Sequence, residues 1–162
     1  MSEVPITDTL GSFAPVLEDT PFDFIQMNEL DAPYWLPELN LVKVISVYDG
    51  DTFHVLGKPK NGDGNVYKFV VRLNGIDTPE MNSKNAKEHE DAVKARDELR
   101  NLIEGEIVQL QKISKDKYGR LLSYVYLYDR TSKDFTQNVT QLMLDQKLGY
   151  EYHGGKKRVV IP

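Results

Sequence analysis

One stretch decides how the rest of the chain is read, residues 66–80: Val66-Tyr-Lys-Phe-Val-Val-Arg-Leu-Asn-Gly-Ile-Asp-Thr-Pro-Glu80. Its first half is an apolar, β-branched run, which predicts a strand with Arg72 near its end. Its second half is a loop, marked by a glycine and a proline, with carboxylates at Asp77 and Glu80. A guanidinium suits phosphate, and two carboxylates suit a hard cation and a proton acceptor. The stretch suggests phosphate-ester chemistry, although an ordinary strand end with a solvated turn has the same composition.

Strand and helix signals around this stretch predict the fold class. Five segments have the composition of strands: residues 41–48, 52–56, 66–73, 106–113 and 121–128. A long helix is predicted over residues 86–103, and a short helix over residues 140–148 with Thr140 as its N-cap. We therefore expect an α+β fold: a five-stranded OB-type β-barrel with a long helix between strands three and four and a short C-terminal helix.

The long helix is predicted from apolar side chains that recur at helical spacing. Its expected inward face consists of Ala86, His89, Ala92, Val93, Leu99, Leu102 and Ile103. Lysine, arginine and acidic residues fill the other side, and Gly105 follows as a C-terminal stop. We expect His89 and His54 to be structural histidines and His153 to be exposed, with no chemistry for any of them.

Charge is distributed unevenly along the 162 residues, whose formal net charge is −5. Residues 1–42 hold eight acidic residues and no Lys or Arg, so the remaining 120 residues carry 17 acidic against 20 basic residues. We expect three parts: an acidic, mostly irregular extension over residues 1–40, a domain over residues 41–153, and a short basic tail over residues 154–162. The mildly basic domain permits a polyanionic partner without demanding one.

Several classes of protein are excluded by composition. The absence of cysteine excludes disulfides and thiolate metal sites. No apolar run approaches the length of a membrane span, and the N-terminus has no basic region followed by an apolar stretch. We therefore expect no membrane partner and, by default, an intracellular location. Nothing in the sequence indicates an obligate protein partner, so a monomer is expected.

Two further clusters carry possible chemistry. Asp49-Gly-Asp51-Thr52 has the composition of a β-turn, but Asp51 and an acid from the 72–80 loop would together form an oxygen-ligand site. Oxygen ligands with no His or Cys nearby indicate Ca²⁺ or Mg²⁺ rather than zinc. Asp116-Lys-Tyr-Gly-Arg120 has the composition of a polar hairpin loop, yet its tyrosine and arginine also suit base stacking and phosphate binding.

In combination and in this order, the three motifs are more specific than any one alone. Asp-Gly-Asp-Thr between strands one and two, Arg-x₄-Asp-Thr-Pro-Glu after strand three, and Asp-Lys-Tyr-Gly-Arg before strand five resemble the staphylococcal nuclease (thermonuclease) family. The resemblance covers residues 41–150, about two-thirds of the chain. It implies an OB-type nuclease domain.

The resemblance also implies a cofactor and its ligands. Asp51 and Asp77 match the carboxylates that hold a calcium ion in the family, and the backbone carbonyl of Thr78 matches a further ligand. One Ca²⁺ ion is expected in preference to Mg²⁺. Bound there, such a cation would offset charge on a phosphate oxygen and align the ester.

Three residues match the family's catalytic groups. Arg72 and Arg120 match the two arginines that bind the scissile phosphate, and Glu80 matches the acid that activates or positions the attacking water. The chemistry is coherent on general grounds, because guanidinium groups stabilise the charge that develops on the phosphate oxygens. A carboxylate in reach of the water accepts its proton.

Other positions match residues that contact a bound nucleotide. Lys117 and Tyr118 correspond directly, and a third contact corresponds to either Tyr150 or Tyr152. The expected function is a calcium-dependent nuclease that hydrolyses phosphodiester bonds of DNA and RNA, preferring single strands, with low sequence specificity. The alternative is a non-catalytic OB-fold module that binds nucleic acid without cutting it. A third reading is a protein–protein adaptor that uses the acidic arm.

Overall fold

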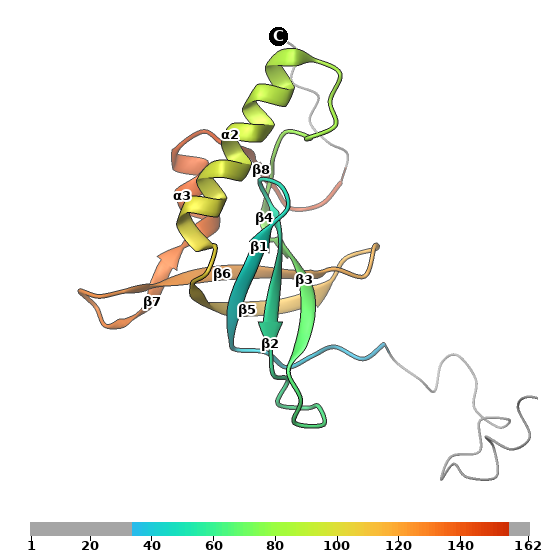
Figure 1. Ribbon diagram of the computed structural model, residues 1–162, viewed down its shortest axis with the longest axis vertical. Helices are drawn as coiled ribbons and strands as arrows, with labels where there is room; N and C mark the ends of the chain where they lie inside the picture. Colours follow the sequence, from blue (N-terminus) through green and yellow to red (C-terminus); the bar gives the residue numbers. More distant parts are fainter. Residues whose placement is uncertain (1–33, 156–162) are drawn as a thin grey trace, which may run out of the picture. The chain divides into compact units, whose positions relative to one another are not determined.

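The computed structural model describes residues 34–155 of the chain (Figure 1). The chain divides into two units, residues 1–35 and residues 36–162, and the fold below is that of the second unit. Most of the predicted acidic extension, residues 1–33, lies outside the described residues, as do residues 156–162 of the predicted basic tail.

Six strands form one sheet, in the order β3-β2-β1-β5-β6-β7. Their bounds are β1 Leu41–Val47, β2 Thr52–Gly57, β3 Tyr67–Leu73, β5 Ile107–Lys115, β6 Leu121–Asp129 and β7 Asp134–Asn138. Neighbouring strands are antiparallel, but β3 also pairs in parallel with β6, with Val71 opposite Leu121. This extra pairing closes five strands into a barrel, with β7 added beside β6. The predicted five-stranded OB-type barrel is confirmed, and its strands begin and end within two residues of the predicted bounds.

A second, smaller sheet was not predicted. It consists of β4 (Gly75–Asp77) and β8 (Tyr150–Tyr152), which pair antiparallel. β4 lies within the stretch expected to be a loop, and β8 comes near the end of the described residues. Three-residue strands are too short to show the alternation on which a sequence-based assignment depends.

The long helix α2 (Ala86–Ile103) agrees with its prediction. The side chain of Asn85 caps its N-terminus by accepting from the amides of Lys87 and Glu88. Its predicted inward face is partly wrong. Ala92, Leu99 and Ile103 are buried together with Ala95, but Ala86 and His89 are exposed because the first turns of α2 extend beyond the barrel (Figure 1).

The short helix α3 (Val139–Asp145) is also present, but its predicted cap is wrong. Asn138 is the N-cap, and its side-chain oxygen accepts from the amide of Gln141 at 3.3 Å. Thr140 lies inside the helix, buried, and its hydroxyl donates to the carbonyl oxygen of Asn74 at 2.7 Å. Both Asn and Thr are good caps, so local sequence could not separate them.

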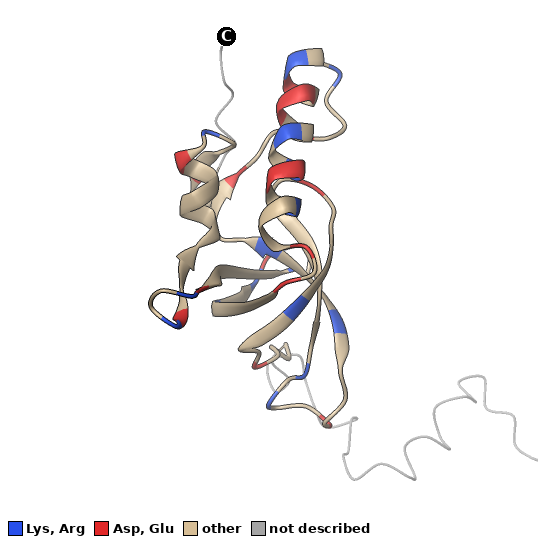
Figure 2. Cartoon of the chain, turned by 60° about the vertical axis from the view of Figure 1, so that its left-hand side comes forward, with Lys and Arg blue, Asp and Glu red and all other residues tan. Residues whose placement is uncertain are grey.

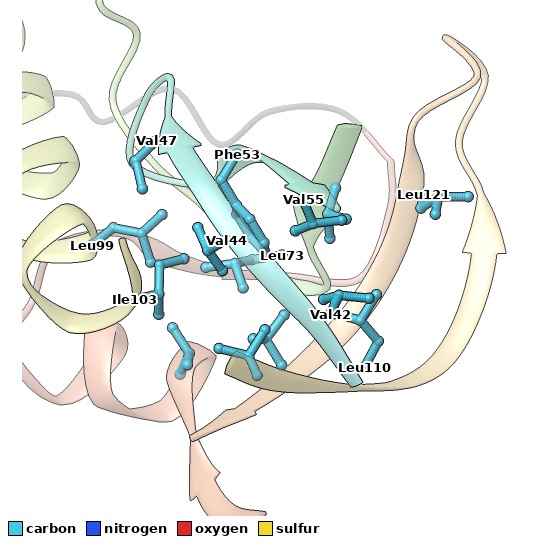
Figure 3. Packing of buried hydrophobic residues seen from close by; sticks show 14 of the residues in the cluster. Val42, Val44, Val47, Phe53, Val55, Leu73, Leu99, Ile103, Leu110 and Leu121 are labelled. Carbon is cyan, nitrogen blue, oxygen red and sulfur yellow. The ribbon is translucent and has the colours of Figure 1, made fainter. Parts of the chain in front are cut away.

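The hydrophobic core fills the barrel and the space between the barrel and the helices. Figure 3 shows Val44, Phe53 and Leu73 from the strands packed near Leu99 and Ile103 of α2. These side chains are completely buried. Within residues 34–155, neither helix has the length and apolarity needed to cross a membrane.

Candidate active site

The β1–β2 turn holds Asp51 at one end of the barrel. The amide of Asp51 donates to Asp49 Oδ1 at 3.1 Å, and the amide of Tyr48 donates to the carbonyl of Thr52 at 2.9 Å. Residue 50 must be glycine, because a Cβ there would lie 2.7 Å from Thr78 Oγ1. The turn is therefore packed tightly against the Thr78 loop, and the carboxylate of Asp51 is buried and fixed.

Strand register places Arg72 beside this carboxylate. Thr52 lies opposite Arg72 in the β2–β3 pairing, so Asp51 adjoins the end of β3. Arg72 Nη2 lies 3.4 Å from Asp51 Oδ2 and 3.0 Å from Asp77 Oδ1. The amide of Thr78 also donates to Asp51 Oδ2, at 3.2 Å. Two carboxylates, one from the β1–β2 turn and one from the end of β4, thus meet at one guanidinium group.

The β4–β8 sheet holds Asp77, which is the last residue of β4. Asp77 lies opposite Tyr150, and Gly75 lies opposite Tyr152. Gly149 permits this close approach, since a Cβ there would lie 2.8 Å from the carbonyl oxygen of Asp77. The short β4–β8 pairing therefore positions the side chain of Asp77, a residue that the sequence interpretation had placed in a loop.

The β5–β6 loop places the second arginine beside the first. Arg120 Nη1 donates to Thr52 Oγ1 at 3.3 Å, and Arg120 Nε donates to Asp116 Oδ2 at 2.7 Å. Asp116 Oδ1 accepts from the amides of Tyr118 and Arg120. The loop is thus folded around one carboxylate, which orients Arg120.

Two carboxylic acids near the site have shifted pKa values. Burial would raise the pKa of Asp116, but the hydrogen bonds from Arg120 and from the amides of its own loop outweigh burial and lower that pKa. Burial raises the pKa of Asp49, and the nearby carboxylate of Asp51 raises it further. The amides of Asp51 and Thr52, which bond to Asp49, only partly offset these two effects.

These side chains line one open cleft of about 930 Å³. All the site residues predicted from sequence, except Tyr150, line it: Asp51, Arg72, Asp77, Thr78, Glu80, Lys117, Tyr118, Arg120 and Tyr152. Tyr150 lines a different groove. Of these two tyrosines, Tyr152 is therefore the one that lines the cleft, and its ring centre lies 5.6 Å from Arg72 Cζ.

Tyr48 and Asp116 are among the residues of the cleft that the sequence interpretation did not assign to the site. Tyr48 lines the cleft with its side chain mostly exposed. The sequence feature that could have identified Tyr48 is its position directly before the Asp-Gly-Asp-Thr turn. Asp116 was quoted only as part of its motif, although an aspartate at the start of a turn commonly bonds the amide two residues on.

The donors in the cleft fit a hard cation. Within residues 34–155, no three His, Cys, Asp or Glu side chains form a metal-binding group. Asp51 and Asp77 nevertheless direct carboxylate oxygens toward the same nitrogen of Arg72, within 3.4 Å. Two carboxylates supplemented by backbone carbonyl and water oxygens suit Ca²⁺ or Mg²⁺. His153 also lines the cleft, but its Nε2 lies 2.9 Å from Glu151 Oε1.

The fold and the cleft together define a class of protein. Its members have an OB-type barrel with carboxylates and guanidinium groups gathered at one end of the strands. Residues 70–155 match the family described as staphylococcal nuclease homologue, and the chain belongs to that family. The match begins within β3 and ends at the last described residue, so it includes Arg72, Asp77, Glu80 and Arg120.

Named relatives are consistent with this assignment. The chain is 34% identical over 91 residues to "Staphylococcal-like nuclease CAN1" of Arabidopsis thaliana, covering 56% of this chain and 24% of that protein. It is 37% identical over 89 residues to the "Thermonuclease" of Staphylococcus hyicus, covering 52% and 47%. It is 26% identical over 138 residues to "Probable endonuclease LCL3" of Komagataella phaffii, covering 72% and 60%. The chain thus spans less than two-thirds of the length of each.

Proposed function

We propose that the chain is a calcium-dependent nuclease that hydrolyses phosphodiester bonds of DNA and RNA with low sequence specificity. One observation carries the proposal: a single cleft gathers Asp51, Arg72, Asp77, Glu80 and Arg120. They come from the β1–β2 turn, from β3, from β4 and the segment after it, and from the β5–β6 loop. A module that only binds nucleic acid has no need of this set. The names of the relatives, among them a thermonuclease and a probable endonuclease, support the same activity.

In this proposal the two arginines bind the scissile phosphate. Asp116 and Thr52 hold Arg120 from one side, while Asp51 and Asp77 hold Arg72 from the other. Donors fixed in advance stabilise developing charge without reorganising, and each such donor is typically worth about 3–4 kcal/mol in the transition state.

Glu80 is proposed to act on the attacking water. Glu80 is exposed and lines the same cleft as the two arginines. From there its carboxylate can accept the water's proton or orient the water, and general-base catalysis contributes about 10²–10⁴-fold.

Asp51, Asp77 and the backbone carbonyl of Thr78 are the residues proposed to hold the calcium ion. When bound, the ion would supply positive charge and Lewis-acid polarisation at a phosphate oxygen. The buried position of Asp51 and its bonds from Thr52 and the Thr78 amide keep one ligand rigid before any ion arrives.

Lys117, Tyr118 and Tyr152 are proposed to contact the nucleotide. Tyr118 is highly exposed, and its ring lies 5.0 Å from Lys117 Nζ and 5.4 Å from Arg120 Cζ. An exposed ring flanked by cations suits stacking of a base next to a bound phosphate. Stacking does not distinguish one base from another, and it requires an unpaired base. Low specificity and a preference for single strands follow.

The deciding experiment is digestion of denatured DNA in Ca²⁺, in Mg²⁺ and in EDTA by the wild type, Glu80→Gln and Arg120→Ala. We expect strong cutting only by the wild type in Ca²⁺. Cutting that survives EDTA, or that survives both substitutions, would end the proposal. A wild type that shifts labelled single strands but never cuts them would establish the alternative, a nucleic-acid-binding module.

A further inference from the structure

A second groove, of about 510 Å³, adjoins the active-site cleft. Residues of α2, the segment that follows α3, and β8 line it. Pro79 lines both hollows, and β8 contributes Tyr152 to the cleft and Tyr150 to the groove. The two hollows are therefore neighbours, with Pro79 and β8 at their common border.

The lining of the groove carries a small excess of positive charge, because three lysines line it against two carboxylic acids. Asp91 forms an ion pair with Lys87 Nζ at 2.6 Å, whereas Glu98 accepts from the neutral amide Nε2 of Gln146 at 3.2 Å and keeps its charge. Lys94 and Lys147 also line it, and within residues 34–155 neither has an ion-pair partner. Figure 2 shows basic and acidic bands alternating along α2, and the α2 residues that line the groove balance in charge, so Lys147, which follows α3, supplies the excess.

The groove also has an aromatic surface. The side chain of Tyr150 is about half exposed, at 49%, although its backbone is fixed by pairing with Asp77. A rigid backbone with an exposed ring is the arrangement that base stacking requires, because little conformational freedom is lost on binding.

We propose that this groove binds the part of a single-stranded nucleic acid that continues beyond the scissile phosphate. Lys94 and Lys147 contact two backbone phosphates, and Tyr150 stacks one base. The inference rests on the proposed nuclease function and extends it: the substrate is a strand several nucleotides long, not a single nucleotide. It also gives Tyr150 and Tyr152 different roles.

Equilibrium binding in EDTA tests the groove without cleavage. Fluorescence anisotropy would measure labelled oligothymidylates of two, four and eight nucleotides against the wild type, Lys94→Ala/Lys147→Ala and Tyr150→Leu. The matched control is Lys58→Ala/Lys133→Ala, which removes the same charge from surfaces outside both hollows. Lys133 and Lys147 share a left-handed backbone, with φ of 55° and 58°, so the control also repeats any backbone effect.

We expect the groove variants to bind the octamer about fivefold or more weakly and the dimer almost as well as the wild type. The double lysine variant should also reduce the salt slope of octamer binding by about 1.4, since each phosphate contact on a single strand contributes about 0.7. Thermal unfolding would verify that all variants are folded.

Other outcomes overturn the inference in distinguishable ways. Equal binding by groove and control variants, or equal loss at every length, removes the groove as a site and leaves the proposed function standing. A wild type that neither binds nor cuts any oligonucleotide removes both.

Discussion

Val71 lies directly opposite Leu121 in the parallel pairing of β3 with β6, and this relationship brings the two arginines of the cleft together. Arg72 lies opposite Leu122 in the same pairing, two residues after Arg120, so strand closure brings both arginines to one cleft. The pairing that closes the fold is thus also the one that assembles the arginine half of the candidate site.

Replacing Arg72 with lysine tests whether cleavage needs only a positive charge at this position or also the planar donor geometry of a guanidinium group. We expect Arg72→Lys to lower the rate of cleavage about 10²–10³-fold, because a lysine keeps the charge but loses the fixed, planar donor pair. Stability should change little, since an ammonium group can still pair with Asp51 and Asp77. Single-turnover cleavage and urea unfolding measure the two effects, with exposed Arg130→Lys as the control. Near-wild-type cleavage by Arg72→Lys would contradict the proposed role.

Gly50→Ala tests the packing of the β1–β2 turn. The added Cβ would lie 2.7 Å from Thr78 Oγ1 and 2.8 Å from Ala95 Cβ, so the turn or its neighbours must move. We expect a loss of about 1–3 kcal/mol in the free energy of unfolding, with weaker activity because Asp51 shifts. Gly62→Ala is the matched control, since its nearest neighbour, Pro59 Cβ, is 3.3 Å away. Equal effects of the two substitutions in urea unfolding would refute this account.

The shifted pKa of Asp116 predicts a pH dependence of stability. Its folded-state pKa lies below the ordinary value of 3.8, so the ionised carboxylate stabilises the folded protein. This contribution is complete at pH values well above 3.8 and is lost as pH falls through the lower, folded-state pKa. We expect Asp116→Asn to destabilise the protein at pH 7 and to match the wild type more closely at pH 3. Urea unfolding at pH 7, 5 and 3 checks this, and a difference that stays constant would contradict it.

Calcium should stabilise the folded protein as well as support cleavage. An ion that binds only the folded state adds about 2.7 kcal/mol at a free concentration of 100 Kd. We expect Ca²⁺ to raise the Tm of the wild type, EDTA to reverse the rise, and Asp77→Asn to abolish it. Asp145→Asn, on the exposed end of α3, is the charge-matched control. A calcium-dependent Tm in Asp77→Asn equal to that of the wild type would place the ion elsewhere.

The barrel was predictable because its five strands are long enough to carry their own signal. Each strand has at least six residues, is rich in β-branched and apolar side chains, and is bounded by turns. The small sheet was not predictable, because Gly75–Asp77 and Tyr150–Tyr152 pair across more than 70 positions and each has only three residues. The inward face of α2 was misjudged at Ala86 and His89, because helical periodicity does not reveal where a helix leaves the surface that it packs against.

The candidate site was predictable as a set of motifs, but its geometry was not. Sequence identified Asp51, Arg72 and Arg120 through three separate motifs, and resemblance joined them. The role of Asp116 in orienting Arg120 depends on a loop conformation that no spacing rule specifies. Which of Tyr150 and Tyr152 lines the cleft depends on the tertiary structure, in which Tyr152 lines the cleft and Tyr150 lines the neighbouring groove.

The β4–β8 pairing has a consequence for biosynthesis. The strand that carries Asp77, β4, is held by a strand made about 70 residues later, next to Gly149, where a Cβ would collide with the Asp77 carbonyl. During translation, the five barrel strands emerge before β8, the strand that pairs with β4. A growing chain on the ribosome therefore has most of its barrel before it has a complete cleft, and a product truncated before residue 149 would lack the finished site.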